Sequence, residues 1–113
     1  MAKSAKNSYI VYHWKTNEEL VCTAGWEKKV AEYLNKNKID FKWQHKIFDV
    51  VMKNGKKVTY RLDLYIVGRK NPWIEIKGYF RDDAREKWEY FHNNIKTNSE
   101  LWDKEVLEKK GIL

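Results

Sequence analysis

Hydrophobic residues recur at helical spacing in two long segments and predict two amphipathic helices. The first covers residues 26–37, and its apolar positions lie three or four residues apart: Trp26, Val30, Tyr33 and Leu34. The second begins at Asp82 and Asp83, whose charge suits a helix N-terminus, and its stripe comprises Ala84, Trp88, Phe91 and Ile95. A last helix over 103–110 is predicted from Asp103 as its N-cap and Gly111 as its stop.

Alternating apolar and polar positions predict the strands. Short β-prone runs over 9–14 and 20–22 suggest a hairpin or an arm. A strand begins at Phe41, and its alternation changes parity near Ile47, which indicates a bulge or bend. Asn54-Gly55 then favours a tight turn, with a return strand over 58–67. Further strands are predicted over 73–77 and, briefly, at Leu101-Trp102.

These elements predict an α/β (α+β) fold, with a central mixed β-sheet flanked by helices. The chain has one Pro and five Gly in 113 residues and contains no linker-like stretch, so we expect a single domain over residues 1–113. Residues 1–22 are expected to form an N-terminal hairpin or a dimerisation arm. With 42% hydrophobic and 15% aromatic residues, the chain can form a packed core.

The net charge of +7 points to a polyanionic partner, with nucleic acid first and an acidic membrane second. A membrane fits less well, because the basic residues do not gather on one amphipathic helix. No apolar run approaches the ~20 residues of a membrane span, and residues 1–7 lack the apolar stretch of a signal peptide. We therefore expect a cytoplasmic protein that is not secreted. Cys22 is the only cysteine, which excludes an intrachain disulfide and a four-cysteine zinc site.

Two acidic residues and a lysine fall on neighbouring predicted strands. Asp63 lies in the middle of the strand over 58–67, whereas Glu75 and Lys77 share one face of the next strand. If these strands pair, Asp63 and Glu75 can converge on a hard cation such as Mg²⁺, with Lys77 beside it. Such a site supports metal-assisted phosphodiester hydrolysis. Glu27, on the border of the first helix's apolar stripe, is a third carboxylate that can face the sheet.

A structural interpretation of the same residues stays open. Charges on one face of a sheet are often a solvated surface with weak cross-strand pairs. Glu27, in the first turn of a helix, can be a partner of the helix dipole and nothing more. Against the first alternative, Glu75 lies in the apolar segment from Trp73 to Phe80, where an unpaired charge is costly.

The order of these motifs resembles the PD-(D/E)XK nuclease superfamily. Within it the chain is most similar to phage Holliday-junction resolvases of the endonuclease I type and to small phage homing-type relatives. The resemblance runs from Ala24 to Phe80, and four segments carry it: Ala24–Val30, Lys38–Trp43, Thr59–Leu64 and Ile74–Phe80. Leu62 stands where the family often has the proline before its aspartate.

The resemblance implies a restriction-endonuclease-like core and assigns roles to several residues. Asp63 and Glu75 would bind Mg²⁺, or Mn²⁺ as a substitute, together with the backbone carbonyl of Ile76. Lys77 would be the catalytic lysine, and Glu27 would hold a second metal or position the attacking water. It also implies DNA as the partner, a homodimer, the cytoplasm of a host cell if the protein is phage-encoded, and no organic cofactor.

Basic residues around these segments are candidate DNA contacts. The expected set is Lys28, Lys29, Arg61, Arg81 and Arg85, which would bind phosphates without reading sequence. Of these, Arg81 and Arg85 are the preferred contacts, whereas for the turn residues Lys56, Lys57, Arg69 and Lys70 a role in solubility is the better explanation. Trp88 and Phe91 are expected in the core, and His45 as a buried, hydrogen-bonded imidazole. Tyr9, Tyr12 and Trp14 fit either a dimer interface or the edge of the sheet.

The sequence thus predicts a Mg²⁺-dependent DNA endonuclease that acts on branched DNA such as Holliday junctions. One alternative is a sequence-directed nicking or homing endonuclease of the same fold. An alternative from another class is a catalytically silent DNA-binding module. The net charge fits all three, and the set of Glu27, Asp63, Glu75 and Lys77 favours an enzyme.

Overall fold

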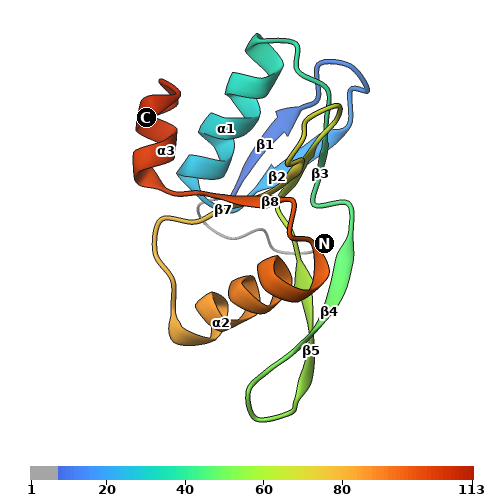
Figure 1. The fold of residues 1–113 in the computed structure, drawn as a ribbon. Coiled ribbons are helices and arrows are strands. Elements are labelled where there is room, and N and C mark those ends of the chain that lie inside the picture. Colours follow the sequence, from blue (N-terminus) through green and yellow to red (C-terminus); the bar gives the residue numbers. More distant parts are fainter. Residues whose placement is uncertain (1–7) are drawn as a thin grey trace.

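The computed structural model describes residues 8–113, which form helices on a mixed β-sheet with two smaller hairpins (Figure 1). The strands are β1 (Tyr9–Tyr12), β2 (Glu19–Cys22), β3 (Phe41–Trp43), β4 (Ile47–Val51), β5 (Lys57–Arg61), β6 (Leu64–Ile66), β7 (Trp73–Ile76) and β8 (Ser99–Trp102). The helices are α1 (Gly25–Lys36), α2 (Asp82–Tyr90), a π-helical turn η1 (Phe91–Ile95) and α3 (Lys104–Lys109). The predicted α+β class is confirmed.

The part of the expected N-terminal arm that falls in residues 1–7 lies outside the described residues, as does the segment on which the signal-peptide expectation rests. In the described part of the chain, no helix has the length and apolar character needed to cross a bilayer.

The central sheet has the strand order β3-β6-β7-β8. Its first three strands are antiparallel neighbours, whereas β8 runs parallel to β7 and pairs Glu75 with Leu101. The helices α1 and α3 cover one face through a core that includes Val30, Leu34, Ile74, Trp102 and Leu107. The other face packs against α2 and the β4–β5 hairpin through Trp73, Trp88 and Phe91, so the last two are core residues as predicted. Both faces of β7 are therefore buried, and Glu75 lies inside the protein.

The predicted strand over 58–67 is in fact two strands, and this prediction is wrong. β5 pairs with β4, while β6 pairs with β3 and β7, so the chain changes sheets at Leu62 and Asp63. The apolar side chains stay buried at every second position across the break, which is why alternation did not reveal it: Tyr60, Leu62, Leu64 and Ile66. The parity change predicted near Ile47 corresponds to the break between β3 and β4, where Gln44 has a φ of 45°.

The turn at Asn54-Gly55 and the N-terminal hairpin form as expected. Gly55 has a φ of 86°, a conformation that glycine adopts without a Cβ clash. β1 and β2 pair in an antiparallel register with Ile10 opposite Val21. One face of this hairpin contributes Leu20 and Cys22 to the core, and the other leaves Ile10, Tyr12 and Val21 exposed.

His45 is exposed, so its predicted burial is wrong. It follows the end of β3, where the chain leaves the sheet, and its ring stacks on Trp73 with centroids 5.9 Å apart. Partial burial, together with the positive charges of Lys42 and Lys46, lowers the pKa of His45.

Candidate active site

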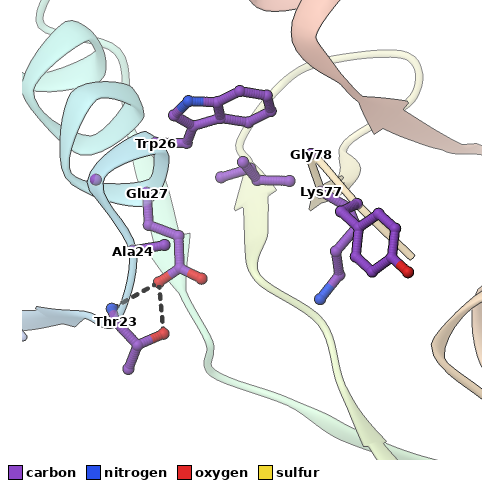
Figure 2. Close-up of a pocket in the computed structure, with 9 residues that line it drawn as sticks. Thr23, Ala24, Trp26, Glu27, Lys77 and Gly78 are labelled. Atoms are coloured by element: carbon purple, nitrogen blue, oxygen red, sulfur yellow. Dashed lines mark hydrogen bonds between the residues drawn. The ribbon is translucent and has the colours of Figure 1, made fainter. Parts of the chain in front are cut away.

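The four residues predicted to carry the chemistry come from four different places in the fold. Asp63 lies at the bend between β5 and β6, and Glu75 lies in β7. Lys77 follows the last residue of β7, and Glu27 lies in the first turn of α1. An open cleft of about 570 Å³ has Glu27 on one wall and Lys77 on the other, with Ile76 between them in the lining. Figure 2 shows the two charged side chains directed into this common space.

Asp63 and Glu75 are a buried pair of carboxyl groups beside Ile76, which lines the cleft, although neither of the two lines it itself. Their exposed fractions are only 9% and 4%. The Asp63 carboxylate accepts a hydrogen bond from the backbone N–H of Ile76, with Oδ2 and N 2.8 Å apart. This bond ties the bend before β6 to the end of β7 and fixes the position of Asp63 relative to Glu75.

One oxygen of this pair has no partner. Glu75 Oε1 and the hydroxyl of Tyr60 are both buried, and neither has a partner at normal hydrogen-bond geometry in the described residues, although Tyr60 and Asp63 lie close enough to Glu75 to shift its pKa as hydrogen-bonding groups. A buried polar atom without a partner costs about 1–3 kcal/mol, and more if it is charged. Glu75 Oε1 and the Tyr60 hydroxyl therefore lie inside the protein without a well-formed hydrogen bond.

Burial raises the pKa values of both carboxyl groups. Burial is the main cause at Asp63, followed by the negative charge of Glu27, while the bond from Ile76 opposes them. At Glu75 the causes are burial and then the charge of Asp63, opposed by Lys77. The same surroundings raise the pKa of Tyr60, chiefly through burial and then through Glu75. An added cation would lower the cost of holding these groups ionised.

Glu27 also has a structural role at the start of α1. Its Oε1 accepts hydrogen bonds from the backbone N–H of Thr23 at 3.0 Å and from the Thr23 hydroxyl at 3.4 Å, as drawn in Figure 2. The residue at the N-cap is Ala24, which has no side-chain acceptor, so Glu27 satisfies a donor beside the helix N-terminus. A role of Glu27 at the helix N-terminus is compatible with a catalytic role, because both hydrogen bonds from Thr23 use the same carboxylate oxygen, Oε1.

The position of Lys77 depends on a close contact between two other residues. The ring of Trp26, from α1, lies directly against the backbone of Gly78, and a Cβ added to Gly78 would lie 2.5 Å from Trp26 Cζ3. Glycine is required for this approach. The contact holds the end of β7 against the start of α1 and so sets the width of the cleft between Lys77 and Glu27.

The donor set fits a magnesium-type ion better than a zinc-type ion. Mg²⁺ takes one or two carboxylates and completes its shell with carbonyl, water and phosphate oxygens. Asp63, Glu75 and the backbone carbonyl of Ile76 are of this kind. Within residues 8–113 no three His, Cys, Asp or Glu side chains lie close enough together to hold a metal by themselves. Glu27 is near enough for its charge to raise the pKa of Asp63, but its carboxylate bonds to Thr23.

The structure separates the five predicted DNA contacts into different regions. Arg85 lines a second cleft of about 340 Å³ together with Lys77, and Arg81 is exposed just before α2. Arg61 is exposed at the end of β5. Lys28 and Lys29 do not line the cleft of Glu27: Lys28 pairs with Glu32 at 3.6 Å, and Lys29 lies beside a separate hollow near the C-terminus.

Three residues near the site were not predicted from the sequence. Thr23 holds Glu27, the Tyr60 hydroxyl lies unpartnered in the surroundings of Glu75, and Tyr79 is exposed between the two clefts. A threonine four positions before Glu27 resembles a capping box displaced by one residue and was a usable signal. Tyr60 and Tyr79 had none, because their roles depend on which strands pair and where the chain turns.

Comparison with known proteins identifies no relative from which the chemistry of the site could be inferred. No protein-family model, no curated protein and no solved structure matches this chain at a significant level. The likeness to PD-(D/E)XK nucleases therefore rests on the residues between Ala24 and Phe80.

Proposed function

We propose that this chain is an endonuclease that requires a divalent cation and hydrolyses phosphodiester bonds in DNA, with branched DNA such as a four-way junction as its substrate. The observation that carries the proposal is the buried pair of Asp63 and Glu75 with its unpartnered oxygen, Oε1 of Glu75. Two adjacent buried carboxylates repel one another and lack water, so they are stable as anions only beside a cation.

The chain's own groups suit this reaction. Asp63, Glu75 and the carbonyl of Ile76 would hold Mg²⁺ or Mn²⁺, which supplies a Lewis acid for the phosphate and an activated water. Lys77, on the wall of the cleft, stabilises the negative charge that grows on the phosphate during attack. Glu27, on the opposite wall, orients the attacking water or contributes to a second ion.

DNA is the proposed polyanion for reasons of charge and position. The net charge is +7, although the site itself is acidic, so the surrounding surface carries the positive excess. Arg85 lies beside Lys77 in the second cleft, where a phosphate next to the cleaved one would lie.

We also propose that the enzyme acts as a homodimer. The outer face of the β1–β2 hairpin exposes three apolar side chains, at 49% for Ile10, 54% for Tyr12 and 45% for Val21. A second copy that covers this face would remove them from water. Two sites in one dimer match a substrate with two strands to cut.

The decisive experiment is a cleavage assay on a four-way junction and on a linear duplex of the same sequence, with Mg²⁺, Mn²⁺ or EDTA. The parent protein is expected to cut the junction only when a divalent ion is present. Glu75→Gln and Lys77→Ala should lower the cutting rate by 100-fold or more, in the range found when a metal ligand or charge-stabilising group is removed. Junction binding should persist in both variants.

Matched substitutions on α3 serve as controls. Glu108→Gln and Lys109→Ala change the same residue types at exposed positions away from the clefts, and both should cut like the parent. If the parent cuts no DNA but binds it equally well with and without a divalent ion, the chain is a silent DNA-binding module. If it cuts one duplex sequence in preference to junctions, the nicking or homing alternative holds.

A further inference from the structure

Tyr79 is the most exposed of the large hydrophobic side chains in the described residues, at 80%. It lines the cleft that contains Glu27 and also the second cleft, which contains Arg85. Lys77 and Gly78 are the other residues that these two clefts share. Tyr79 therefore stands on the ridge between the two clefts, two residues from the proposed catalytic lysine.

The backbone that carries Tyr79 is held in place. Gly78, its neighbour in the chain, is packed under the ring of Trp26. The backbone N–H of Lys77 donates to the carbonyl of Trp102 at 3.2 Å, and this bond anchors Lys77, two residues before Tyr79, to β8. An exposed ring on an anchored backbone loses little conformational freedom when a flat ligand stacks on it.

Positive groups line the clefts that Tyr79 borders: Lys77 lines both, and Arg85 lines the second. The guanidinium of Arg85 lies over the ring of Phe80 at 5.0 Å. Asp103 is the acidic residue of the second cleft, and its Oδ1 is engaged as the cap of α3, where it accepts from the N–H of Val106. An exposed aromatic ring in clefts that also contain cationic groups fits a nucleic-acid strand, in which bases alternate with phosphates.

We propose that Tyr79 is a stacking platform for an unpaired DNA base next to the phosphate that Lys77 contacts. The inference rests on the proposed nuclease function and deepens it by naming a substrate feature. Stacking on Tyr79 requires the base to leave the duplex, which costs a few kcal/mol for a paired base and little for one that is already unpaired. The site therefore selects DNA with a bulge, mismatch or branch at the cut.

Binding can be tested on two duplexes that differ only in one central base. In one duplex a 2-aminopurine is bulged, and in the other it is paired. Both are titrated in EDTA, where no cutting is expected, against the parent and against Tyr79→Phe, Tyr79→Trp and Tyr79→Leu. The leucine variant keeps apolar bulk and loses the ring, so it is the matched control for stacking. A circular-dichroism spectrum checks that each variant is folded.

The parent, Tyr79→Phe and Tyr79→Trp should quench the bulged 2-aminopurine and prefer the bulged duplex. Tyr79→Leu should lose the quenching and bind the bulged duplex roughly 5- to 100-fold more weakly, the range measured when a stacking ring is removed. Its affinity for the paired duplex should stay unchanged. If Tyr79→Leu keeps both the quenching and the preference, the inference is overturned.

A parallel cleavage assay with Mg²⁺ separates this inference from the function on which it rests. If the parent cuts no DNA at all, the nuclease proposal fails. If the parent cuts beside the bulge and Tyr79→Leu cuts there at the same rate, the nuclease proposal stands and the role of Tyr79 is excluded. A loss confined to the bulged substrate, restored by Tyr79→Phe, supports both.

Discussion

A glutamate in a strand that is buried on both faces needs interactions that offset its desolvation, because removing a charged carboxylate from water costs several kcal/mol. Glu75 is such a residue, and its pKa is raised by burial and then by Asp63. Structural compensation is incomplete, since Oε1 has no hydrogen-bond partner in the described residues. An uncharged side chain would fold at lower cost here, which is the physical ground for the proposed metal role of Glu75.

Replacing Glu75 by glutamine should therefore stabilise the protein when no metal is present. The amide has the same shape, carries no charge and can donate to the Asp63 carboxylate. We expect Glu75→Gln to raise the free energy of unfolding in EDTA by about 1–3 kcal/mol. Addition of Mg²⁺ should stabilise the parent and leave Glu75→Gln unchanged, because only the parent retains both acidic ligands. Urea denaturation with and without Mg²⁺ measures both effects.

The exposed substitution Glu108→Gln is the control, and its stability should follow the parent in both buffers. A metal role for Glu75 would be refuted if Glu75→Gln lowered stability in EDTA while Mg²⁺ left the parent unaffected. That pattern would make the carboxylate a structural group.

At this scale the sequence predicted the burial of Glu75 from its apolar neighbours, and the structure confirms it. Alternation placed Asp63 in mid-strand, whereas Asp63 lies at a bend between two strands, and Lys77 follows the end of β7. The missing information concerned contacts between segments. The tie from Ile76 to Asp63 joins residues 13 positions apart, and the bond between Glu27 and Thr23 depends on how the chain enters α1.

At the scale of elements, helices were predicted better than strand boundaries. The apolar stripes of α1 and α2 extend over several turns, and Asp103 caps α3 as expected, with Oδ1 3.1 Å from the N–H of Val106. The break at Leu62 and Asp63 could not be predicted, because burial keeps its period of two while the pairing partner changes from β4 to β3 and β7. That break positions Asp63 at the end of β7.

The contact between α1 and the end of β7 leads to a prediction at this scale. Gly78→Ala places a methyl group 2.5 Å from Trp26 Cζ3, so either the indole ring or the segment after β7 must move. Overpacking of this kind costs about 1–3 kcal/mol. We expect a lower free energy of unfolding and, because Lys77 moves with the segment, a cutting rate reduced by roughly 10-fold or more.

Gly25→Ala is the matched control, since a Cβ at that position meets no heavy atom within 4 Å. It should leave both stability and cutting close to those of the parent. Equal behaviour of the two alanine variants would show that the Trp26 ring adapts freely and does not set the width of the cleft.

At the scale of the whole molecule, charge and apolar surface have separate locations. The acidic residues of the site lie between α1 and β7, beneath a surface whose excess charge is positive. The β1–β2 hairpin instead exposes Ile10, Tyr12 and Val21 on one face. Sequence patterning predicted the hairpin, but which of its faces packs on the core followed only from the structure.

This exposed face is the proposed dimer interface, and two charged substitutions test it. In the double variant Ile10→Lys with Val21→Lys, the new ammonium groups would face their copies across a two-fold axis, and burying them unpaired would cost several kcal/mol. We expect the parent to have twice the 13.7 kDa mass of one chain by light scattering, and the double variant to have the monomer mass.

Val67→Lys provides the control, because Val67 is similarly exposed at 42% but lies beyond β6, outside the hairpin. It should remain a dimer. A parent that is monomeric at micromolar concentration, or a double variant that stays dimeric, would exclude this interface. If dimerisation through the hairpin brings two sites onto one junction, the monomeric double variant should still nick single strands but should no longer cut two strands within one binding event. A supercoiled plasmid with a cruciform reports the difference: paired cuts give linear DNA, and single nicks give nicked circles.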